Sequence, residues 1–221
     1  MFDHDPIQLP PAIWRFPPHS EWPQSDLVGR GADLQAPTLI AAYQAGIFPM
    51  PTDLAFGEDD IAWWSPLRRG ILPLDGLRVT RSMRRSERRY RCTENQQFER
   101  VMRGCATPNR PGGWITDTFV DAYVELHERG WAHSVEVLDE SGTLVGGLYG
   151  VRVGRFFAGE SMFHLARDAS KVALMHLVRE MQTHSMRLLD VQWSTPHLAT
   201  LGAITISRED YLERLTHAIT A

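Results

Sequence analysis

Residues 132–160, AHSVEVLDESGTLVGGLYGVRVGRFFAGE, decide the fold of this chain. The β-branched and aromatic content of 132–137 and of 144–153 is typical of strands. A turn at Gly154 then leads into a third strand that begins with residues 155–158. The stretch therefore predicts three consecutive strands.

Helices surround these strands in the sequence. Thr116 and Asp168 are of the residue types that cap helix N-termini, and each precedes a segment with apolar residues at helical spacing. The further predicted elements are a helix over 116–130, a helix over 168–181, a short buried strand over 188–192 and a closing helix over 208–218. Strands and helices mixed in this order predict an α/β (α+β) fold.

The N-terminal region differs in composition, because nine of the 14 prolines lie within the first 51 residues. Proline fixes φ and removes a donor, so extended chain and turns are expected there, with one short helix over Pro37–Ala45. A loop from Pro49 to about Asp60 carries proline, glycine and several acids. We therefore expect a small N-terminal domain over 1–62 and a larger domain over 63–221.

Composition limits the class of protein. The chain has 221 residues, a net charge of −4 and only two cysteines, which is too few for a disulfide framework. Its first residues, MFDHDPIQLPP, have neither the basic nor the apolar region of a signal peptide, and no apolar run is long enough for a membrane helix. These features predict a soluble, cytoplasmic protein.

One segment, RVTRSMRRSERRYR over 78–91, is strongly basic. Its seven arginines and one glutamate give it a charge of +6, which leaves −10 for the rest of the chain. In helical geometry Arg81, Arg84, Arg85 and Arg88 share a face, and guanidinium groups bind phosphate bidentately. This face is a candidate site for a nucleic-acid backbone; the alternative is a solvated helix without a ligand.

Polar residues interrupt two apolar strands. Glu160 follows FFAG, and Asp190 and Gln192 interrupt LLDVQW. A carboxylate in such a setting is costly unless it is paired, and it often marks a site, although an acid that satisfies backbone donors is an equally good interpretation. Aromatic side chains near glycines, prolines and strand ends either stack on unpaired bases or pack in the core: Trp63, Trp64, Trp114, Tyr123, Phe156 and Phe157.

Other chemistry has little support. GESMF (159–163) lacks the final glycine of a nucleophile elbow, and GRGADL (29–34) lacks the third glycine of a dinucleotide loop. The nine histidines form no HExxH or Cys/His pattern. We therefore expect no metal and no nucleotide cofactor.

Several motifs occur in one order along the chain: AHSVEV, LVGGLYGV, FFAGESMFH and DASKVAL within 132–174, AAYQAGIFP (41–49), WWSP (63–66), GWIT (113–116), LLDVQ (188–192) and HLATLGA (197–203). From about Gly29 to Leu212 the chain resembles the bacterial leucyl/phenylalanyl-tRNA–protein transferases. That resemblance implies a small N-terminal domain followed by a GNAT-like acyltransferase domain. It also implies transfer of leucine, phenylalanine or, less readily, methionine from aminoacyl-tRNA to proteins that begin with arginine or lysine, which marks them for degradation by the N-degron route. No cofactor is implied.

The resemblance also assigns roles to residues. It implies that Asp190 and Gln192 orient the attacking α-amine and help to deprotonate it. It also implies that Glu160 lies near the reacting ester and, together with Asp190, holds the cationic N-terminus of the acceptor. It places the adenosine against Met50, Trp114 and Tyr123, and the tRNA acceptor arm is expected on the arginine face. The implied pocket for the amino-acid side chain consists of Leu148, Phe157, Met162, Leu174, Leu177 and Leu189.

The sequence departs from the family pattern at Met50, where many members have tryptophan, and at GRGADL, where a glycine-rich GGDLS form is commoner. Two alternatives remain. An acyl-CoA-dependent GNAT acyltransferase needs a glycine-rich pyrophosphate loop before a helix, and RDASK (167–171) has no glycine. A non-enzymatic RNA-binding module would use the arginine face alone. We expect a monomer.

Overall fold

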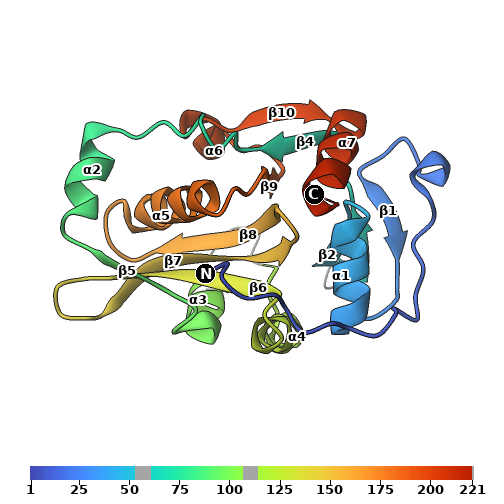
Figure 1. The fold of residues 1–221 in the computed structure, drawn as a ribbon, viewed down its shortest axis with the longest axis horizontal. Helices are drawn as coiled ribbons and strands as arrows, with labels where there is room; N and C mark the ends of the chain where they lie inside the picture. The colour runs from blue at the N-terminus through green and yellow to red at the C-terminus, as the bar shows by residue number, and fades with distance from the viewer. Residues whose placement is uncertain (53–60, 107–113, 221) are drawn as a thin grey trace.

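The computed structural model describes residues 1–52, 61–106 and 114–220, which form a small sheet and a large sheet with helices around them (Figure 1). The small sheet has the order β1-β3-β2, and both pairings are antiparallel. Helix α1 lies beside it, as predicted within one residue at each end. The N-terminal elements are η1 (His19–Glu21), β1 (Leu27–Arg30), α1 (Ala36–Gln44), β2 (Phe48–Pro51) and β3 (Ile61–Trp64).

The large sheet has seven strands in the order β10-β4-β9-β8-β7-β6-β5. Only β8 and β9 are parallel; every other neighbouring pair is antiparallel. The strands are β4 (Arg68–Ile71), β5 (Arg91–Glu94), β6 (Ala132–Leu138), β7 (Leu144–Val153), β8 (Phe156–His164), β9 (Leu188–Gln192) and β10 (Ile204–Ser207).

Helices cover both faces of this sheet. Helix α5 lies on one face, with α2 packed against it, whereas α3 and α4 lie on the other (Figure 1). The parallel pairing of β8 with β9 needs a crossover, and α5 supplies it. The helices of this domain are α2 (Arg81–Glu87), α3 (Phe98–Cys105), α4 (Asp117–Glu128), α5 (Ala169–Thr183), α6 (Pro196–Thr200) and α7 (Arg208–Ile219).

The β7–β8 hairpin lies in the middle of the large sheet, and its two strands and the turn between them were predicted from the sequence. Gly154 makes its turn at φ 57°, in the left-handed region that favours glycine. Gly150 permits a close approach of β8, because a Cβ there would lie 2.1 Å from the carbonyl oxygen of Ala158. The hairpin is buried along most of its length, and it therefore carries apolar residues on both faces of the sheet.

Strands β8 and β9 are paired only at their beginnings. Their last paired residues are Ala158 and Asp190, after which neither strand continues the ladder with the other. Residues 159–162 of β8 and 191–192 of β9 therefore leave the pairing with open space between them. This divergence creates the cavity described below.

Several local predictions differ from the structure. Thr116 and Asp168 occupy N-cap positions, but neither side chain makes a capping hydrogen bond. Asp168 has φ 59°, and its carboxylate instead accepts hydrogen bonds from Ser82, Ser86 and Lys171. The predicted acidic loop lies mostly outside the described residues, and its first residues belong to β2.

The expected domain boundary between residues 62 and 63 falls inside β3. Since β3 is hydrogen-bonded between β1 and β2, its residues Trp63 and Trp64 belong to the small sheet. We propose that the N-terminal domain ends after Trp64. Within the described part of the chain, none of the helices has the length and the apolar composition that crossing a membrane requires.

Candidate active site

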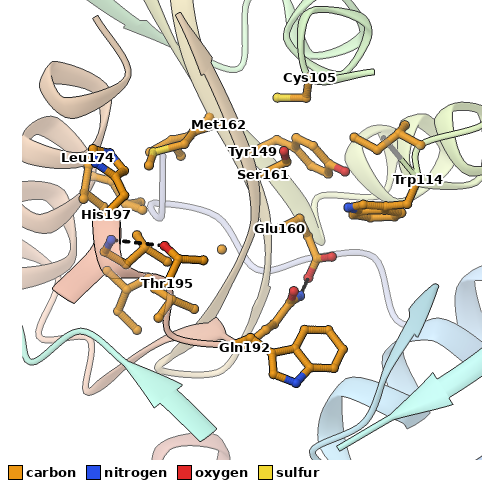
Figure 2. A pocket seen from close by; sticks show the side chains of 18 residues that line it. Cys105, Trp114, Tyr149, Glu160, Ser161, Met162, Leu174, Gln192, Thr195 and His197 are labelled. Atoms are coloured by element: carbon orange, nitrogen blue, oxygen red, sulfur yellow. Dashed lines mark hydrogen bonds between the residues drawn. The ribbon is translucent and has the colours of Figure 1, made fainter. Parts of the chain in front are cut away.

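A cavity of about 420 Å³ opens where β8 and β9 separate (Figure 2). Strands β7, β8 and β9 form its floor, and α5 and the start of α6 form one side. Its wall is largely apolar, as is usual for a small-molecule site. Five of the six residues expected to form an amino-acid pocket line it: Leu148, Met162, Leu174, Leu177 and Leu189.

The sixth predicted residue, Phe157, does not line this cavity. Its side chain is fully buried and packs edge-to-face on Phe2, with 5.9 Å between ring centroids. Phe157 belongs to the same apolar cluster as the five lining residues, so it supports the wall from behind. The sequence could not show which residues line the cavity here, because neighbouring residues of β8 are buried on both faces of the sheet.

Glu160 and Gln192 form the polar end of the cavity (Figure 2). The Nε2 of Gln192 donates to Oε1 of Glu160 at 2.9 Å, which leaves the Gln192 carbonyl oxygen as an acceptor. Gln192 has φ 61°, a strained backbone conformation for a residue with a side chain. Its backbone N–H donates to Oδ1 of Asp190 at 2.8 Å, and this bond holds the unusual conformation.

Glu160 is an acid in an unfavourable environment. Burial raises its pKa to about 8; the Tyr43 hydroxyl and the Gln192 amide oppose this shift, whereas the negative charge of Asp190 adds to it. Oε2 of Glu160 is buried without a well-aligned hydrogen bond among the described residues. A carboxyl group with a pKa near neutrality can hold or release a proton during a reaction, and it is therefore suited to acid–base work.

Asp190 does not line the cavity. Its side chain is fully buried, and Arg69 binds both of its oxygens, at 2.8 Å and 2.5 Å. Tyr211 donates to Oδ2 at 3.0 Å. Asp190 and Gln192 lie together, as predicted from their spacing. They are connected, however, through the Gln192 backbone, and the charge of Asp190 is balanced by Arg69.

The three residues expected to contact adenosine lie in different places. Trp114 lines the cavity. Tyr123 is fully buried, and its hydroxyl shares a hydrogen bond of 2.5 Å with that of Tyr43. Met50 lies on β2, paired with Ala62, and is not part of the lining. Of these three residues, only Trp114 therefore reaches the cavity.

The arginine face is present and faces solvent. Arg81, Arg84 and Arg85 lie on α2, Arg88 is its C-cap, and all four are exposed. Two contacts fix the orientation of this helix: Met83 is buried, and Ser82 and Ser86 donate to the carboxylate of Asp168. The guanidinium groups therefore extend away from the protein as a separate basic surface.

Some cavity residues were not predicted. Trp193 lines the cavity, donates to Asp26 at 3.0 Å and packs on Phe48 and Trp64, so it joins the N-terminal domain to the site. Further lining residues without a predicted role are Cys105, Ile115, Tyr149, Gly159, Ser161, Val191, Thr195, His197 and Leu198. His197 was within reach of sequence reasoning, since it opens the HLATLGA motif.

Arg69 is the residue that the sequence concealed most completely. It lies beside Arg68 and close to many other arginines, with nothing in the local pattern to separate it from a surface residue. In the structure its guanidinium is buried between the rings of Tyr211 and Phe48, at 4.2 Å and 4.8 Å from their centroids.

Among the described residues, the cavity lining contains no group of three side chains placed to share a metal ion.

Comparisons with known proteins match this chain to one family. The family model for the leucyl/phenylalanyl-tRNA protein transferase matches residues 71–216, and the model for the N-terminal domain of that protein matches residues 32–67. Three proteins of the same name are similar over most of both chains. That of Pseudoalteromonas atlantica is 44% identical over 210 residues, 92% of this chain and 88% of its own. That of Maricaulis maris is 48% identical over 83% of this chain and 86% of its own. That of Idiomarina loihiensis is 41% identical over 96% and 90%.

A solved structure of L-PGS from Bacillus licheniformis aligns with a TM-score of 0.40 and 11% identity, over 75% of this chain and 55% of that chain, a level too low to inform function. The two family models, by contrast, cover most of the chain in the expected order. The chain belongs to the leucyl/phenylalanyl-tRNA protein transferase family and is an aminoacyltransferase.

Proposed function

We propose that this chain moves leucine, phenylalanine or methionine from aminoacyl-tRNA to the α-amine of proteins that begin with arginine or lysine, in the cytoplasm, and so marks them for degradation by the N-degron route. The cavity between β8 and β9 is the proposed site of transfer. The observation that carries the proposal is the Glu160–Gln192 pair at one end of a largely apolar cavity.

The apolar wall suits the amino-acid side chain. Leu148, Met162 and Leu174 contribute flexible or γ-branched side chains, which can pack around leucine, methionine or a phenyl ring. With the side chain seated there, the aminoacyl ester would lie toward Glu160 and Gln192. Trp114, which lines the cavity, would stack on the terminal adenosine, and base stacking on an aromatic ring contributes about 1–3 kcal/mol.

The reaction needs little chemical assistance. The α-nitrogen attacks the ester carbonyl, a C–N bond forms, the C–O bond to the ribose breaks, and the ribose hydroxyl finally carries the proton that the amine loses. Because the ester is already activated, holding the two reactants in contact supplies much of the rate. The free carbonyl oxygen of Gln192 accepts a hydrogen bond from the amine, and ionised Glu160 receives its proton before passing it on.

The charge of Glu160 also fits a basic acceptor. A cationic arginine or lysine side chain at the cavity favours the ionised form of Glu160, because a nearby opposite charge lowers a carboxyl pKa. Asp190 cannot serve in the same way, since Arg69 already balances its charge. We therefore treat Asp190 as a positioning residue that acts through the backbone of Gln192.

The arginine face completes the proposal. Four exposed arginines on and just after α2 offer charge for the phosphate backbone of the acceptor arm. The position of Asp168 argues against an acyl-CoA donor. Its buried carboxylate lies at the start of α5, where the pyrophosphate of such a donor would bind, and the two negative charges would repel each other. An RNA-binding module without activity would not explain the buried Glu160 and Gln192.

The direct test is transfer of labelled leucine from leucyl-tRNA to a peptide that begins with arginine. The peptide should be labelled, a matched peptide that begins with glutamate should not, and acetyl-CoA should not replace the charged tRNA. Gln192→Ala should lower the single-turnover rate while leaving tRNA binding near that of the parent, because its interaction is made in the transition state. Transfer from acetyl-CoA, or an unchanged rate in the variant, would contradict the assignment.

A further inference from the structure

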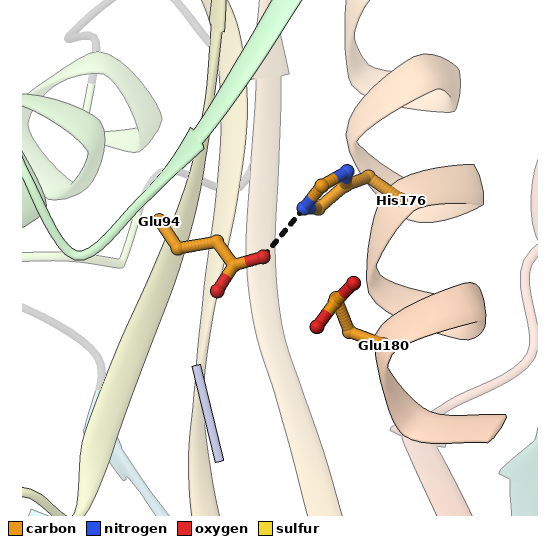
Figure 3. Close-up of side chains that lie close together, drawn as sticks. All are labelled: Glu94, His176 and Glu180. Carbon is orange, nitrogen blue, oxygen red and sulfur yellow. Dashed lines mark hydrogen bonds and ion pairs between the residues drawn. The ribbon is translucent and has the colours of Figure 1, made fainter. Parts of the chain in front are cut away.

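Away from the cavity, three potential metal ligands meet between β5 and α5 (Figure 3). Glu94 is the last residue of β5, and His176 and Glu180 lie on α5. Their ligand atoms all lie within 4.8 Å of one another, and none of the three lines the cavity. We propose that Glu94, His176 and Glu180 form a binding site for a divalent transition-metal ion of the Zn²⁺ type.

The geometry suits such an ion. His176 and Glu180 are four residues apart, so they project from the same face of α5, one turn from each other. Glu94 approaches them from β5, and its Oε1 lies 2.7 Å from Nε2 of His176. In a tetrahedral site with ligand bonds of about 2.0–2.1 Å, the ligand atoms are about 3.3 Å apart. Small rotations of half-buried side chains would bring all three into that range.

The ligand types also fit. Imidazole nitrogen and carboxylate oxygen are common zinc ligands, and the open fourth position would be taken by water. Metal binding requires an ionised carboxylate. The carboxylate of Glu94 already faces the imidazole of His176, with 2.7 Å between Oε1 and Nε2, so both ligand groups point to the same space.

The charge around the cluster leaves room for a cation. The Met1 ammonium pairs with Glu94 at 2.5 Å and lies 3.7 Å from Asp3. Glu180 has His184 as its ion-pair partner, at 3.8 Å. Among the described ion pairs, no lysine or arginine meets Glu94 or Glu180. A divalent ion would thus offset an excess of negative charge that the protein's own cations leave.

Such an ion would connect β5 to α5, two elements that are 82 residues apart at Glu94 and His176. Its effect would be on stability, because a ligand that binds only the folded chain raises the free energy of unfolding by mass action. Helix α5 also supplies Leu174 and Leu177 to the cavity, but the metal site itself takes no part in transfer. The proposal therefore stands or falls separately from the proposed function.

The test is calorimetric titration of the full chain with ZnCl₂ after removal of metal with a chelator. The parent should bind one Zn²⁺ ion tightly and unfold at a higher temperature in its presence. Co²⁺ bound in its place should give the visible absorption of a tetrahedral site. His176→Ala and Glu180→Gln should each weaken Zn²⁺ binding at least about tenfold, since even outer-shell partners of a metal change affinity by that much.

The matched controls are His217→Ala and Glu213→Gln, which remove the same groups from the exposed face of α7 and should bind Zn²⁺ as the parent does. Thermal unfolding in chelator reports whether each variant is folded, and Glu180→Gln, which keeps the size of the side chain, covers the case in which His176→Ala fails to fold. Absence of Zn²⁺ binding by the parent would overturn the proposal. Equal affinity of parent, His176→Ala and Glu180→Gln would also overturn it and would assign the ion to other surface groups.

Discussion

Arg69 and Asp190 form a fully buried, two-pronged ion pair, with Nε–Oδ1 at 2.8 Å and Nη2–Oδ2 at 2.5 Å. The pair connects β4 to β9 at the position where β9 stops pairing with β8. Oδ1 of Asp190 also accepts the backbone N–H of Gln192, so the ion pair sets the conformation of a residue in the cavity. A buried charge pair thereby becomes the support of the proposed reaction centre.

Replacement of Asp190 should therefore reduce stability as well as activity. Asp190→Asn leaves the Arg69 guanidinium buried without its counter-charge, and breaking a buried ion pair in this way costs roughly 3–5 kcal/mol. Urea unfolding followed by circular dichroism measures the loss. Asp121→Asn, an exposed change on α4, should cost much less. If Asp190→Asn were as stable as the parent, the role assigned to this ion pair would be wrong.

Glu160→Gln should change how stability depends on pH. Between the ordinary carboxyl pKa of 4.5 and about 8, the folded parent holds a proton on Glu160 that the unfolded chain has released. The folded state therefore binds more protons, and the stability of the parent falls as pH rises through this window, by up to about 1.4 kcal/mol per pH unit. Glutamine does not ionise, so the free energy of unfolding of the variant lacks this contribution to its pH dependence.

The free energy of unfolding of Glu160→Gln minus that of the parent should accordingly increase from pH 5 toward pH 8, because only the parent loses stability over this range. Chemical unfolding of both proteins at several pH values checks this, with Glu128→Gln as a control on α4. A difference that does not vary with pH would show that Glu160 ionises normally in the folded state.

The apolar cavity should set the size of the transferred amino acid. Met162→Trp fills space near Leu174, and overpacking costs roughly 1–3 kcal/mol, so kcat/KM with phenylalanyl-tRNA should fall at least about tenfold. Leu165→Trp, an exposed position that follows β8, is the control and should transfer phenylalanine normally. If Met162→Trp, folded as the parent, used phenylalanyl-tRNA at the parental rate, the side chain must bind elsewhere.

The arginine face should determine how tRNA binding responds to salt. Alanine at Arg81, Arg84 and Arg85 should weaken binding and reduce the slope of log affinity against log salt by up to roughly 0.9 for each lost phosphate contact on a duplex. Filter binding at several salt concentrations gives the slope. The control carries alanine at the exposed residues Arg15, Arg187 and Arg214, which removes the same charge elsewhere. Equal slopes in the two triple variants would show that the arginine face is a solvated surface that does not contact the tRNA phosphates.

Patterns with a short range in sequence were predicted well. The β7–β8 hairpin, α5 and β9 follow from residue type, spacing and a glycine turn, and each was found within a few residues of its expected place. The short elements β4, β5, α3 and β10 were not predicted. Each has four to eight residues and owes its existence to a neighbour: β10, for example, pairs along its whole length with β4, more than 130 residues away in sequence.

The sequence by itself determined that Glu160, Asp190 and Gln192 interrupt apolar strands, because a costly polar residue in such a place is visible in the order of residues. It also determined a basic face on α2, since four arginines at helical spacing need only a helix to gather them. What it could not determine is which of the two acids is paired with a cation and which has a raised pKa. Only the tertiary structure brings Arg69 across from β4 to pair with Asp190, while Glu160 has no ion pair among the described residues and burial raises its pKa to about 8. The physical reason is that an ionisation state depends on burial and on charges a few ångströms away, and these come from residues that are distant in the chain.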